Sequence, residues 1–339
     1  MATNPSNPRA ALVARRRIAF SAGASGLALL MLAAAAGPVA AAPPVHARVV
    51  QGTLFVTGTP FSDAITLGVS AADPGQLRID VGSAAATVDL ATFNDIVIAA
   101  GKGDDSVKLD TANGAFTTAK PTVVFGGSGD DALFGGSGNE TFFGGSGDDR
   151  VDGNGGADTA FLGSGNDAFV WDPGDGSDLV EGGSGFDTHV FNGAGGNEIM
   201  AATANGSRVK FTRNLGNIVM DLDSIEALDV NALAGTDQVT INDLTGTDMT
   251  DVTVNLAGSL GGTTPDGAAD TVQVNGTAGN DTIHASADAG AVVVSGLTAT
   301  VRVTHADVAL DKLAIDGLGG SDIELVDGAV NGLIGFSLK

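Results

Sequence analysis

Short stretches of alternating apolar and polar residues run along most of this chain. The pattern is clear at residues 209–211, 218–222, 252–256 and 301–303. Alternation with a period of two predicts β-strands with one buried face, because successive side chains of a strand point to opposite sides. Beyond the first 41 residues, no stretch shows the 3.6-residue apolar period of an amphipathic helix. We therefore expect an all-β protein.

The middle of the chain repeats every nine residues. Seven nonapeptides begin at Gly126, and the two residues Trp171 and Asp172 are inserted after the fifth. The eighth position is apolar in six repeats and is His189 in the seventh. A flexible Gly/Ser linker would require neither a constant acidic position nor a constant apolar one. The sixth position is always acidic, and its residues are Asp131, Glu140, Asp149, Asp158, Asp167, Asp178 and Asp187.

Each position of the repeat has a residue suited to a tight turn followed by a short strand. Glycine at positions one, two and four permits positive φ and close passage of neighbouring backbone. The turn leaves carbonyl oxygens pointing inwards, and the sixth position adds a carboxylate. Oxygen ligands without imidazole or thiolate suit Ca²⁺. Positions seven to nine form a strand with one inward side chain, so two nonapeptides make one 18-residue turn of a solenoid with a thin core.

The GGxGxD array resembles the RTX (repeats-in-toxin), or hemolysin-type, calcium-binding repeats. This resemblance implies a right-handed parallel β-roll, a type of β-solenoid, with Ca²⁺ held between successive turns along each edge. Asp131, Asp149, Asp167 and Asp187 would then line one edge of the roll. Glu140, Asp158 and Asp178 would line the other, which gives up to about five ions as the metal content. Ligand sharing between neighbouring ions would be greatest at Asp149, Asp158 and Asp167, and Glu140 departs from the pattern by one methylene.

A weaker unit recurs on both sides of the array. Its acidic residues each follow a glycine-containing turn and precede a strand pattern. We expect them to bond their own turns rather than a metal ion, except Asp105, which lies in a closer match to the nonapeptide turn. The flanking strands could continue the solenoid or form a separate sandwich, and the inserted pair Trp171-Asp172 is expected to bulge outwards. The residues of this weaker unit are Asp63, Asp105, Asp237, Asp281 and Asp322.

The N-terminus has the pattern of a bacterial-type export signal. Arg15, Arg16 and Arg17 precede an apolar stretch, and small residues at Val39-Ala40-Ala41 provide a cleavage site. An uncleaved membrane anchor is the alternative, but the stretch is only weakly apolar and Gly37-Pro38 interrupts it. We expect a secreted, extracellular protein with no membrane span in its mature part. The predicted organisation is a signal peptide over 1–41, a β-rich segment over 42–125, the calcium roll over 126–191 and a β-rich segment over 192–339.

Composition adds support for calcium and excludes several classes of protein. The chain has 51 glycines in 339 residues but only 10 prolines, which excludes collagen. Its 40 acidic and 16 basic residues give a formal net charge of −24, and it has no tyrosine, so nucleic-acid binding is not expected. An exported protein without cysteine cannot be stabilised by disulfides. Bound calcium is the natural substitute.

No catalytic motif accompanies the repeats. The chain has 4 histidines and no HExxH sequence, and its GGSGD segments lack the glycine that a nucleophile elbow needs after serine. We therefore expect no enzyme activity. The predicted function is that of a secreted calcium-binding protein that folds on binding its ions and has a structural, adhesive or surface-associated role. Its expected partners are calcium ions and cell-surface or matrix components. The alternative is an exported enzyme or toxin in which the roll is an accessory folding module.

Overall fold

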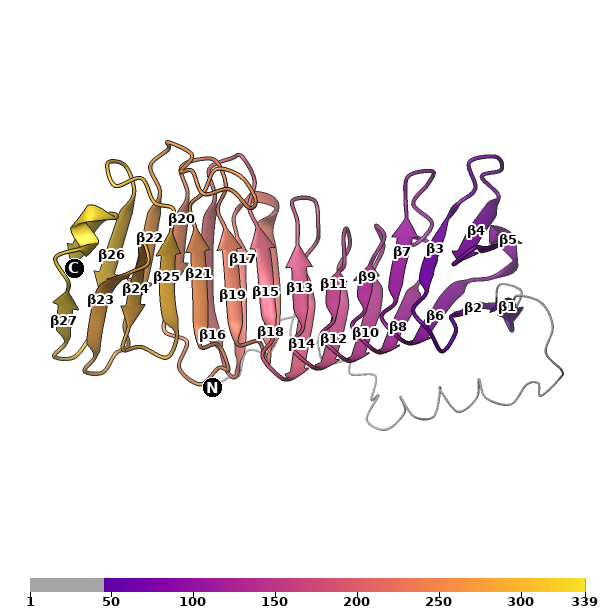
Figure 1. Cartoon of the computed structure of the whole chain (residues 1–339), viewed down its shortest axis with the longest axis horizontal. Coiled ribbons are helices and arrows are strands. Elements are labelled where there is room, and N and C mark those ends of the chain that lie inside the picture. The colour runs from indigo at the N-terminus through magenta and orange to yellow at the C-terminus, as the bar shows by residue number, and fades with distance from the viewer. Residues whose placement is uncertain (1–45, 339) are drawn as a thin grey trace, which may run out of the picture. The chain divides into compact units, whose positions relative to one another are not determined.

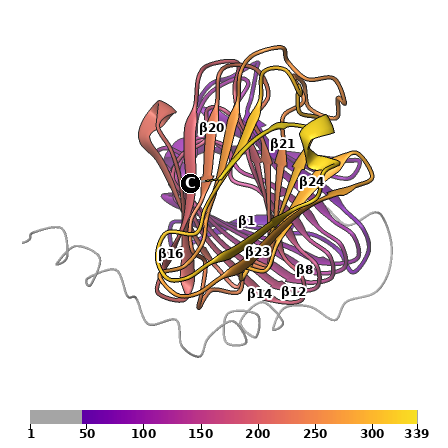
Figure 2. The same cartoon turned by 90° about the vertical axis from the view of Figure 1, so that its left-hand side faces the viewer.

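The computed structural model describes residues 46–338, and the predicted signal peptide lies outside them. The described chain is all-β, as expected, and is built from two sheets of 14 strands each. It passes repeatedly from one sheet to the other, so that successive turns stack along the sheets (Figure 1). Viewed down the stack, the strands of successive turns lie over one another (Figure 2). The parallel sheets and their stacked aspartates are consistent with a parallel β-roll.

Sheet I contains the strands that follow one edge of the stack, and sheet II contains those that follow the other. In spatial order, sheet I is β1 (His46–Val50), β2 (Thr53–Thr57), β6 (Asp95–Lys102), β8 (Thr122–Ser128), β10 (Glu140–Ser146), β12 (Thr159–Ser164), β14 (Leu179–Ser184), β18 (Ile218–Asp223), β17 (Arg208–Arg213), β16 (Ile199–Asn205), β20 (Gln238–Ile241), β22 (Thr271–Asn275), β26 (Lys312–Asp316) and β28 (Gly335–Leu338). Sheet II is β27 (Ile323–Val326), β23 (Thr282–Asp288), β24 (Ala291–Ser295), β25 (Thr300–Thr304), β21 (Asp251–Asn255), β19 (Ala227–Asn231), β15 (Thr188–Asn192), β13 (Ala168–Trp171), β11 (Arg150–Asp152), β9 (Ala132–Phe134), β7 (Ser106–Asp110), β3 (Ala64–Val69), β4 (Gln76–Val81) and β5 (Ala84–Asp89).

Helical structure is confined to three short 3₁₀ turns within residues 46–338. None of them is long or apolar enough to cross a membrane. They are η1 (Leu90–Thr92), η2 (Leu215–Asn217) and η3 (Val330–Gly332).

The nonapeptide array forms turns of 18 residues, as the repeat length predicts. In sheet I, Thr141 of β10 pairs in parallel with Thr159 of β12, and in sheet II Val151 of β11 pairs with Leu133 of β9. The offset grows to 20 residues after the insertion, where Phe169 of β13 pairs with His189 of β15. The insertion therefore enlarges one turn and leaves the alternation of strands between the sheets unchanged.

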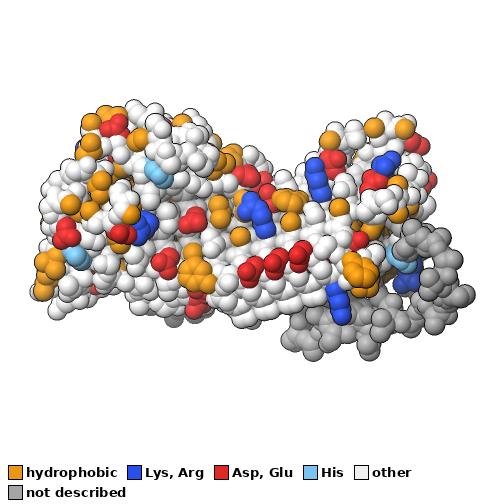
Figure 3. All heavy atoms as spheres, in the orientation of Figure 1, with side chains coloured by type: hydrophobic (Ala, Val, Ile, Leu, Met, Phe, Trp, Pro, Cys, Tyr) orange, Lys and Arg blue, Asp and Glu red, His pale blue; other side chains and the backbone are white. Residues whose placement is uncertain are grey.

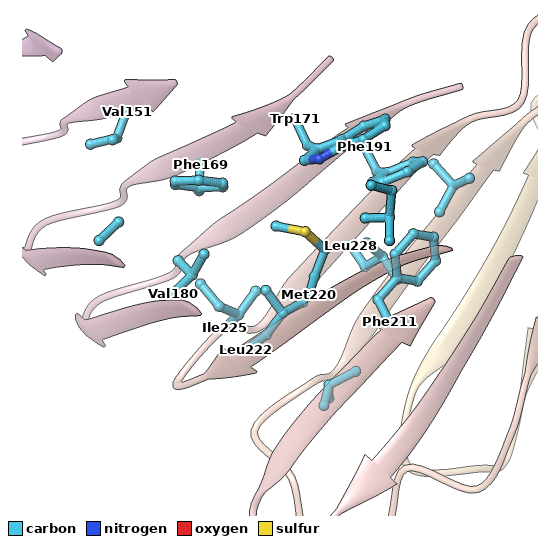
Figure 4. Packing of buried hydrophobic residues seen from close by; sticks show 14 of the residues in the cluster. Val151, Phe169, Trp171, Val180, Phe191, Phe211, Met220, Leu222, Ile225 and Leu228 are labelled. Atoms are coloured by element: carbon cyan, nitrogen blue, oxygen red, sulfur yellow. The ribbon is translucent and has the colours of Figure 1, made fainter. Parts of the chain in front are cut away.

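The inward side chain of each array strand is buried between the sheets. All eighth-position residues are completely buried, including His189. Trp171 also lies in this core, so the expectation that the Trp171-Asp172 pair bulges out is wrong for the tryptophan. Its ring stacks on Phe191 with 4.2 Å between centroids (Figure 4). Its Nε1 donates a hydrogen bond of 2.8 Å to the carbonyl of Gly176.

The flanking segments continue the same two sheets. Sheet I runs from β8 of the array back through β6 and forward through β20 to β28, so the solenoid alternative is correct. Three antiparallel excursions interrupt the stacked turns, at β3–β4–β5, β16–β17–β18 and β23–β24–β25. Most flanking strands bury two or more apolar side chains, whereas most array strands bury one and β13 buries three, Phe169, Val170 and Trp171. Strand β20, for example, buries both Val239 and Ile241.

Candidate metal centre

Two edges of the stack hold the acidic residues of the repeats. We call edge one the set of turns that lead from sheet I to sheet II, and edge two the set that leads back. Edge one contains Asp131, Asp149, Asp167 and Asp187, and edge two contains Glu140, Asp158 and Asp178. The structure therefore places all seven predicted residues on the edges that the repeat pattern assigns to them.

The glycines of the turns are required by close backbone contact. Gly127 has φ of +123°, a backbone conformation that residues other than glycine rarely adopt. A Cβ atom on Gly127 would also lie 2.1 Å from the carbonyl oxygen of Gly101 in the preceding turn of edge one. The same contact recurs at Gly145, whose Cβ would lie 2.2 Å from the carbonyl oxygen of Gly127. Successive turns thus stack with no room for side chains between them.

One carboxylate oxygen of each edge-one aspartate joins neighbouring turns. The backbone N–H of Asp131 donates to Oδ1 of Asp149 at 2.8 Å, and that of Asp149 donates to Oδ1 of Asp167 at 2.7 Å. The N–H of Asp167 donates in the same way to Asp187 at 2.8 Å. This ladder continues beyond the array, since Asp105 donates its N–H to Asp131 at 2.8 Å.

Edge two carries a matching ladder. The N–H of Glu140 donates to Oδ1 of Asp158 at 2.7 Å, and that of Asp158 donates to Oδ1 of Asp178 at 2.8 Å. The longer side chain of Glu140 folds back, so that its Oε2 accepts the N–H of Gly136 in its own turn at 2.8 Å. The extra methylene is accommodated without a break in the ladder.

The other carboxylate oxygen has no hydrogen-bond partner in any of the seven turns. These oxygens are Oδ2 of Asp131, Asp149, Asp158, Asp167, Asp178 and Asp187, and Oε1 of Glu140. The residues that carry them are no more than 3 % exposed. A buried carboxylate oxygen without a partner is costly, because the charge has lost its water and gained nothing in return.

Backbone carbonyls lie close to these unpartnered oxygens. A Cβ built on Gly126 would lie 2.4 Å from Oδ2 of Asp131 and 2.7 Å from the carbonyl oxygen of Gly144, which belongs to the next turn. On Gly144 the corresponding contacts are Oδ2 of Asp149 at 2.5 Å and the carbonyl of Leu162 at 2.4 Å. The carboxylate of one turn and a carbonyl of the next therefore face the same small space.

Burial makes these carboxylates weak acids when no ion is bound. Desolvation, with a smaller contribution from nearby carboxylates, raises the pKa of Asp158 to about 9 and the pKa of Asp149 to about 7. Burial likewise raises the pKa of Asp178 to about 7 and that of Asp131 to about 6. Backbone N–H donors act in the opposite direction without compensating. A bound cation would therefore stabilise the ionised carboxylates of each site.

The donor set fits a hard divalent cation. Every side-chain donor is a carboxylate oxygen, and such ligands suit Ca²⁺, which takes six to eight oxygens. Within residues 46–338 no group of three or more histidine, aspartate or glutamate side chains could by itself hold a metal ion. Backbone carbonyls of the turns would have to complete the coordination, which explains why the turn sequence, and not only the acidic position, is repeated.

Another ladder, which we call the outer ladder, runs along the exposed side of edge one. The N–H of Asp130 donates to Oδ1 of Asp104 at 3.0 Å, and that of Asp148 donates to Oδ1 of Asp130 at 2.8 Å. These fifth-position residues are exposed, and Figure 3 shows acidic side chains in a row on the surface. The repeat pattern in the acidic sixth position does not predict this ladder. Its signal is the frequency of Asp and Asn at the fifth position, where a short polar side chain can accept the next turn's N–H.

The acidic residues outside the array divide into two groups. Asp63 and Asp281 accept N–H groups of their own turns, from Thr59 at 2.5 Å and Thr277 at 2.7 Å, as turn chemistry predicts. Asp105 and Asp237 instead keep a buried Oδ2 without a partner. Asp270 does so as well, although its turn shows no repeat signature and was not identified from the sequence.

Comparison with known proteins bears on these turns. The family model of the RTX calcium-binding nonapeptide repeat matches in four copies, at residues 123–139, 134–169, 173–188 and 273–289. No curated protein matches the chain. Among solved structures, the extracellular lipase LipA from Serratia marcescens is 13 % identical, with a TM-score of 0.16. That alignment covers 62 % of this chain and 44 % of the lipase, so the match spans less than half of the lipase's length.

Proposed function

Because the chain is an RTX calcium-binding repeat protein, we propose that residues 126–191 fold when they bind Ca²⁺ outside the cell. In this proposal the roll is a calcium-dependent structural element, and the flanking β segments present a surface for adhesion or association with cell-surface or matrix components. The protein is not an enzyme. Asp131, Asp149, Asp167 and Asp187 bind ions on edge one, and Glu140, Asp158 and Asp178 bind them on edge two.

The observation that carries this proposal is the row of unpartnered carboxylate oxygens. Six of the seven predicted ligands use one oxygen to join adjacent turns, Glu140 uses one within its own turn, and all seven leave the other oxygen buried without a partner. Asp105 has the same arrangement one turn before the array on edge one, since its Oδ1 accepts the N–H of Asp63 and its Oδ2 has no partner, which extends the row by one turn. Calcium bound between turns would supply the missing positive charge along both edges.

Coupling between binding and folding follows from the thin core of the array. Most array strands bury a single apolar side chain, and the carboxylates of adjacent turns repel one another when no ion is present. The ordering of each residue costs about 1–2 kcal/mol of backbone entropy, which so small a core does not offset. Ligands that bind only the folded state stabilise it, so calcium at extracellular, roughly millimolar concentration would drive folding.

A calcium titration followed by far-ultraviolet circular dichroism tests the coupling. We expect β signal to increase between EDTA and about 10 mM Ca²⁺. Trp171 is the only tryptophan and is fully buried in the array core, so its fluorescence should shift to shorter wavelength over the same range. A β signal and an emission maximum that do not respond to calcium would contradict the proposal.

The surface role is tested separately from calcium binding. The calcium-loaded protein is incubated with immobilised cell-surface glycans, and the supernatant is examined by mass spectrometry for hydrolysis products. Retention on the glycans without product formation supports a binding role. Product formation that depends on the protein would instead favour the exported enzyme.

A further inference from the structure

Edge two continues beyond the array into the C-terminal flank. There it carries another ladder of acidic residues, which we call the C-terminal ladder. The N–H of Glu198 donates to Oδ1 of Asp237 at 2.8 Å, and the N–H of Asp237 donates to Oδ1 of Asp270 at 2.8 Å. Asp270 in turn donates its N–H to Oδ1 of Asp311 at 3.0 Å. These four residues repeat the arrangement of the array in turns that lack its glycine pattern.

The two ends of the C-terminal ladder have partners within the chain. The buried carboxylate of Glu198 forms an ion pair with Arg213, whose guanidinium also lies 5.1 Å from the ring centre of Trp171. At the other end, the second oxygen of Asp311 accepts the N–H of Asp307 at 2.6 Å. A cation from the chain satisfies the first carboxylate, and a backbone donor satisfies the last.

The two middle residues have neither kind of partner. Oδ2 of Asp237 and Oδ2 of Asp270 are buried without a hydrogen bond, and the residues are 2 % and 1 % exposed. Their turns are joined by Asp266, whose Oδ2 accepts the N–H of Gly235 at 2.9 Å. Asp266 therefore adds a third negative charge between the same two turns, which increases the need for a cation.

The ladder alone does not explain why these residues are aspartates. It needs only one side-chain oxygen per turn, and asparagine supplies that oxygen elsewhere in this chain. Asn139 accepts the N–H of Ala157 at 3.0 Å, and Asn166 accepts that of Phe186 at 3.0 Å. Asparagine at 237 and 270 would keep the ladder and avoid two buried charges. The second carboxylate oxygen must therefore have another use.

We propose that Asp237 and Asp270 form a second calcium-binding site, outside the nonapeptide repeats. None of the four segments that match the RTX repeat includes either residue. With oxygen as the only donor element, the site would take a hard divalent cation, and its ligands would be the two free carboxylate oxygens together with carbonyls of their turns. The ion would supply positive charge to Asp237 and Asp270 in the middle of the ladder, as Arg213 does for Glu198 at its end.

Equilibrium dialysis against calcium tests this proposal in the whole protein. Wild type is compared with D237N/D270N, with the array variant D149N/D158N, and with D248N, which removes an exposed charge from the same flank. We expect D237N/D270N to bind at least one ion fewer than wild type, and D248N to bind the same number. An unchanged ion count in D237N/D270N would overturn the proposal. If only D149N/D158N binds fewer ions, the calcium sites of the array are supported and the proposed site at Asp237 and Asp270 is not.

Thermal unfolding with and without calcium separates metal binding from a purely structural role. In EDTA, D237N/D270N should melt at the same temperature as wild type or higher, because two buried like charges are gone and the ladder acceptor is kept. In calcium, its increase in melting temperature should be smaller than that of wild type. An equal drop in both conditions would mean that the carboxylates serve only the fold. The single variants D237N and D270N provide the same comparison should the double variant not fold.

Discussion

At the scale of single residues, the sixth-position carboxylate uses its two oxygens differently. In Asp149, Oδ1 accepts the N–H of Asp131, whereas Oδ2 faces the space between turns without a partner. Its neighbour in sequence, Asp148, also accepts an N–H of the next turn, from Asn166 at 2.7 Å, but it is exposed and has no buried oxygen. Adjacent aspartates of the same turn therefore provide a matched pair for measuring what the buried oxygen does.

Replacement of Asp149 by asparagine should weaken calcium binding by about tenfold or more, which corresponds to about 1.4 kcal/mol. The variant keeps the ladder acceptor and loses one charged ligand that two ions of edge one would share. D148N removes the same charge from an exposed position and should change the affinity by less than about fivefold. Isothermal titration calorimetry measures both, and D187N at the array's end should lie between them. Equal effects of D149N and D187N would count against shared ligands.

The raised pKa values predict how the ion-free protein responds to pH. Burial raises the pKa of Asp158 to about 9 and that of Asp149 to about 7, so the folded state holds protons that the unfolded state releases. The stability from these groups is complete below about pH 4, the unfolded value, and is lost as pH rises through 7 and 9. In EDTA, the melting temperature should therefore be higher at pH 5.5 than at pH 8. With saturating calcium the order should reverse, since protons compete with the ion, and the same order in both buffers would contradict this account.

At the scale of elements, the turns depend on glycine where backbones of successive turns touch. Gly145 has φ of +123°, and its Cβ would collide with Gly127. By contrast, Gly195 lies in the edge-two turn that ends at Glu198, has open space around it and has no positive φ. The glycines of the edge turns are thus not equivalent, and only those at the backbone contact are required.

The variant G145A should destabilise the calcium-bound protein by about 1–3 kcal/mol from backbone strain, with the collision adding to this value. G195A should change the free energy of unfolding by less than about 1 kcal/mol, because it lacks both costs. Urea denaturation at saturating calcium measures the two variants. A G145A protein as stable as G195A would mean that the turns can separate without loss.

At the scale of the whole molecule, the two continuous sheets enclose a hydrophobic core that is thinner in the array than in the flanks. Most strands of the flanks bury two or three apolar side chains, as β6 does with Ile96, Ile98 and Ala100, whereas most array strands bury one, as β11 does with Val151. Buried apolar area contributes roughly 25 cal/mol per Å², so the flanks should hold their structure better than the array when calcium is absent. The array is then a calcium-dependent link between two more stable ends.

Hydrogen exchange followed by mass spectrometry should reveal this difference along the chain. On addition of EDTA, amides of residues 126–191 should lose protection, while those of β6 and β20 should keep most of theirs, because local opening follows local burial. Calcium should restore protection in the array. Uniform loss of protection from residue 46 to residue 338 would indicate a single cooperative unit instead.

The repeat, its 18-residue turn and the inward eighth position could be predicted from the sequence alone, because a nine-residue period and the alternation of side chains in strands are local properties of the chain. The two acidic edges were implied by the resemblance to RTX repeats. Whether the flanks join the solenoid could be seen only in the folded chain, since isolated strand patterns do not specify their neighbours. The tertiary structure also placed Trp171 in the core and showed the free oxygens of Asp237 and Asp270. Residues 33 positions apart meet in adjacent turns only once the chain has folded, so no local pattern could reveal that their charges share one space.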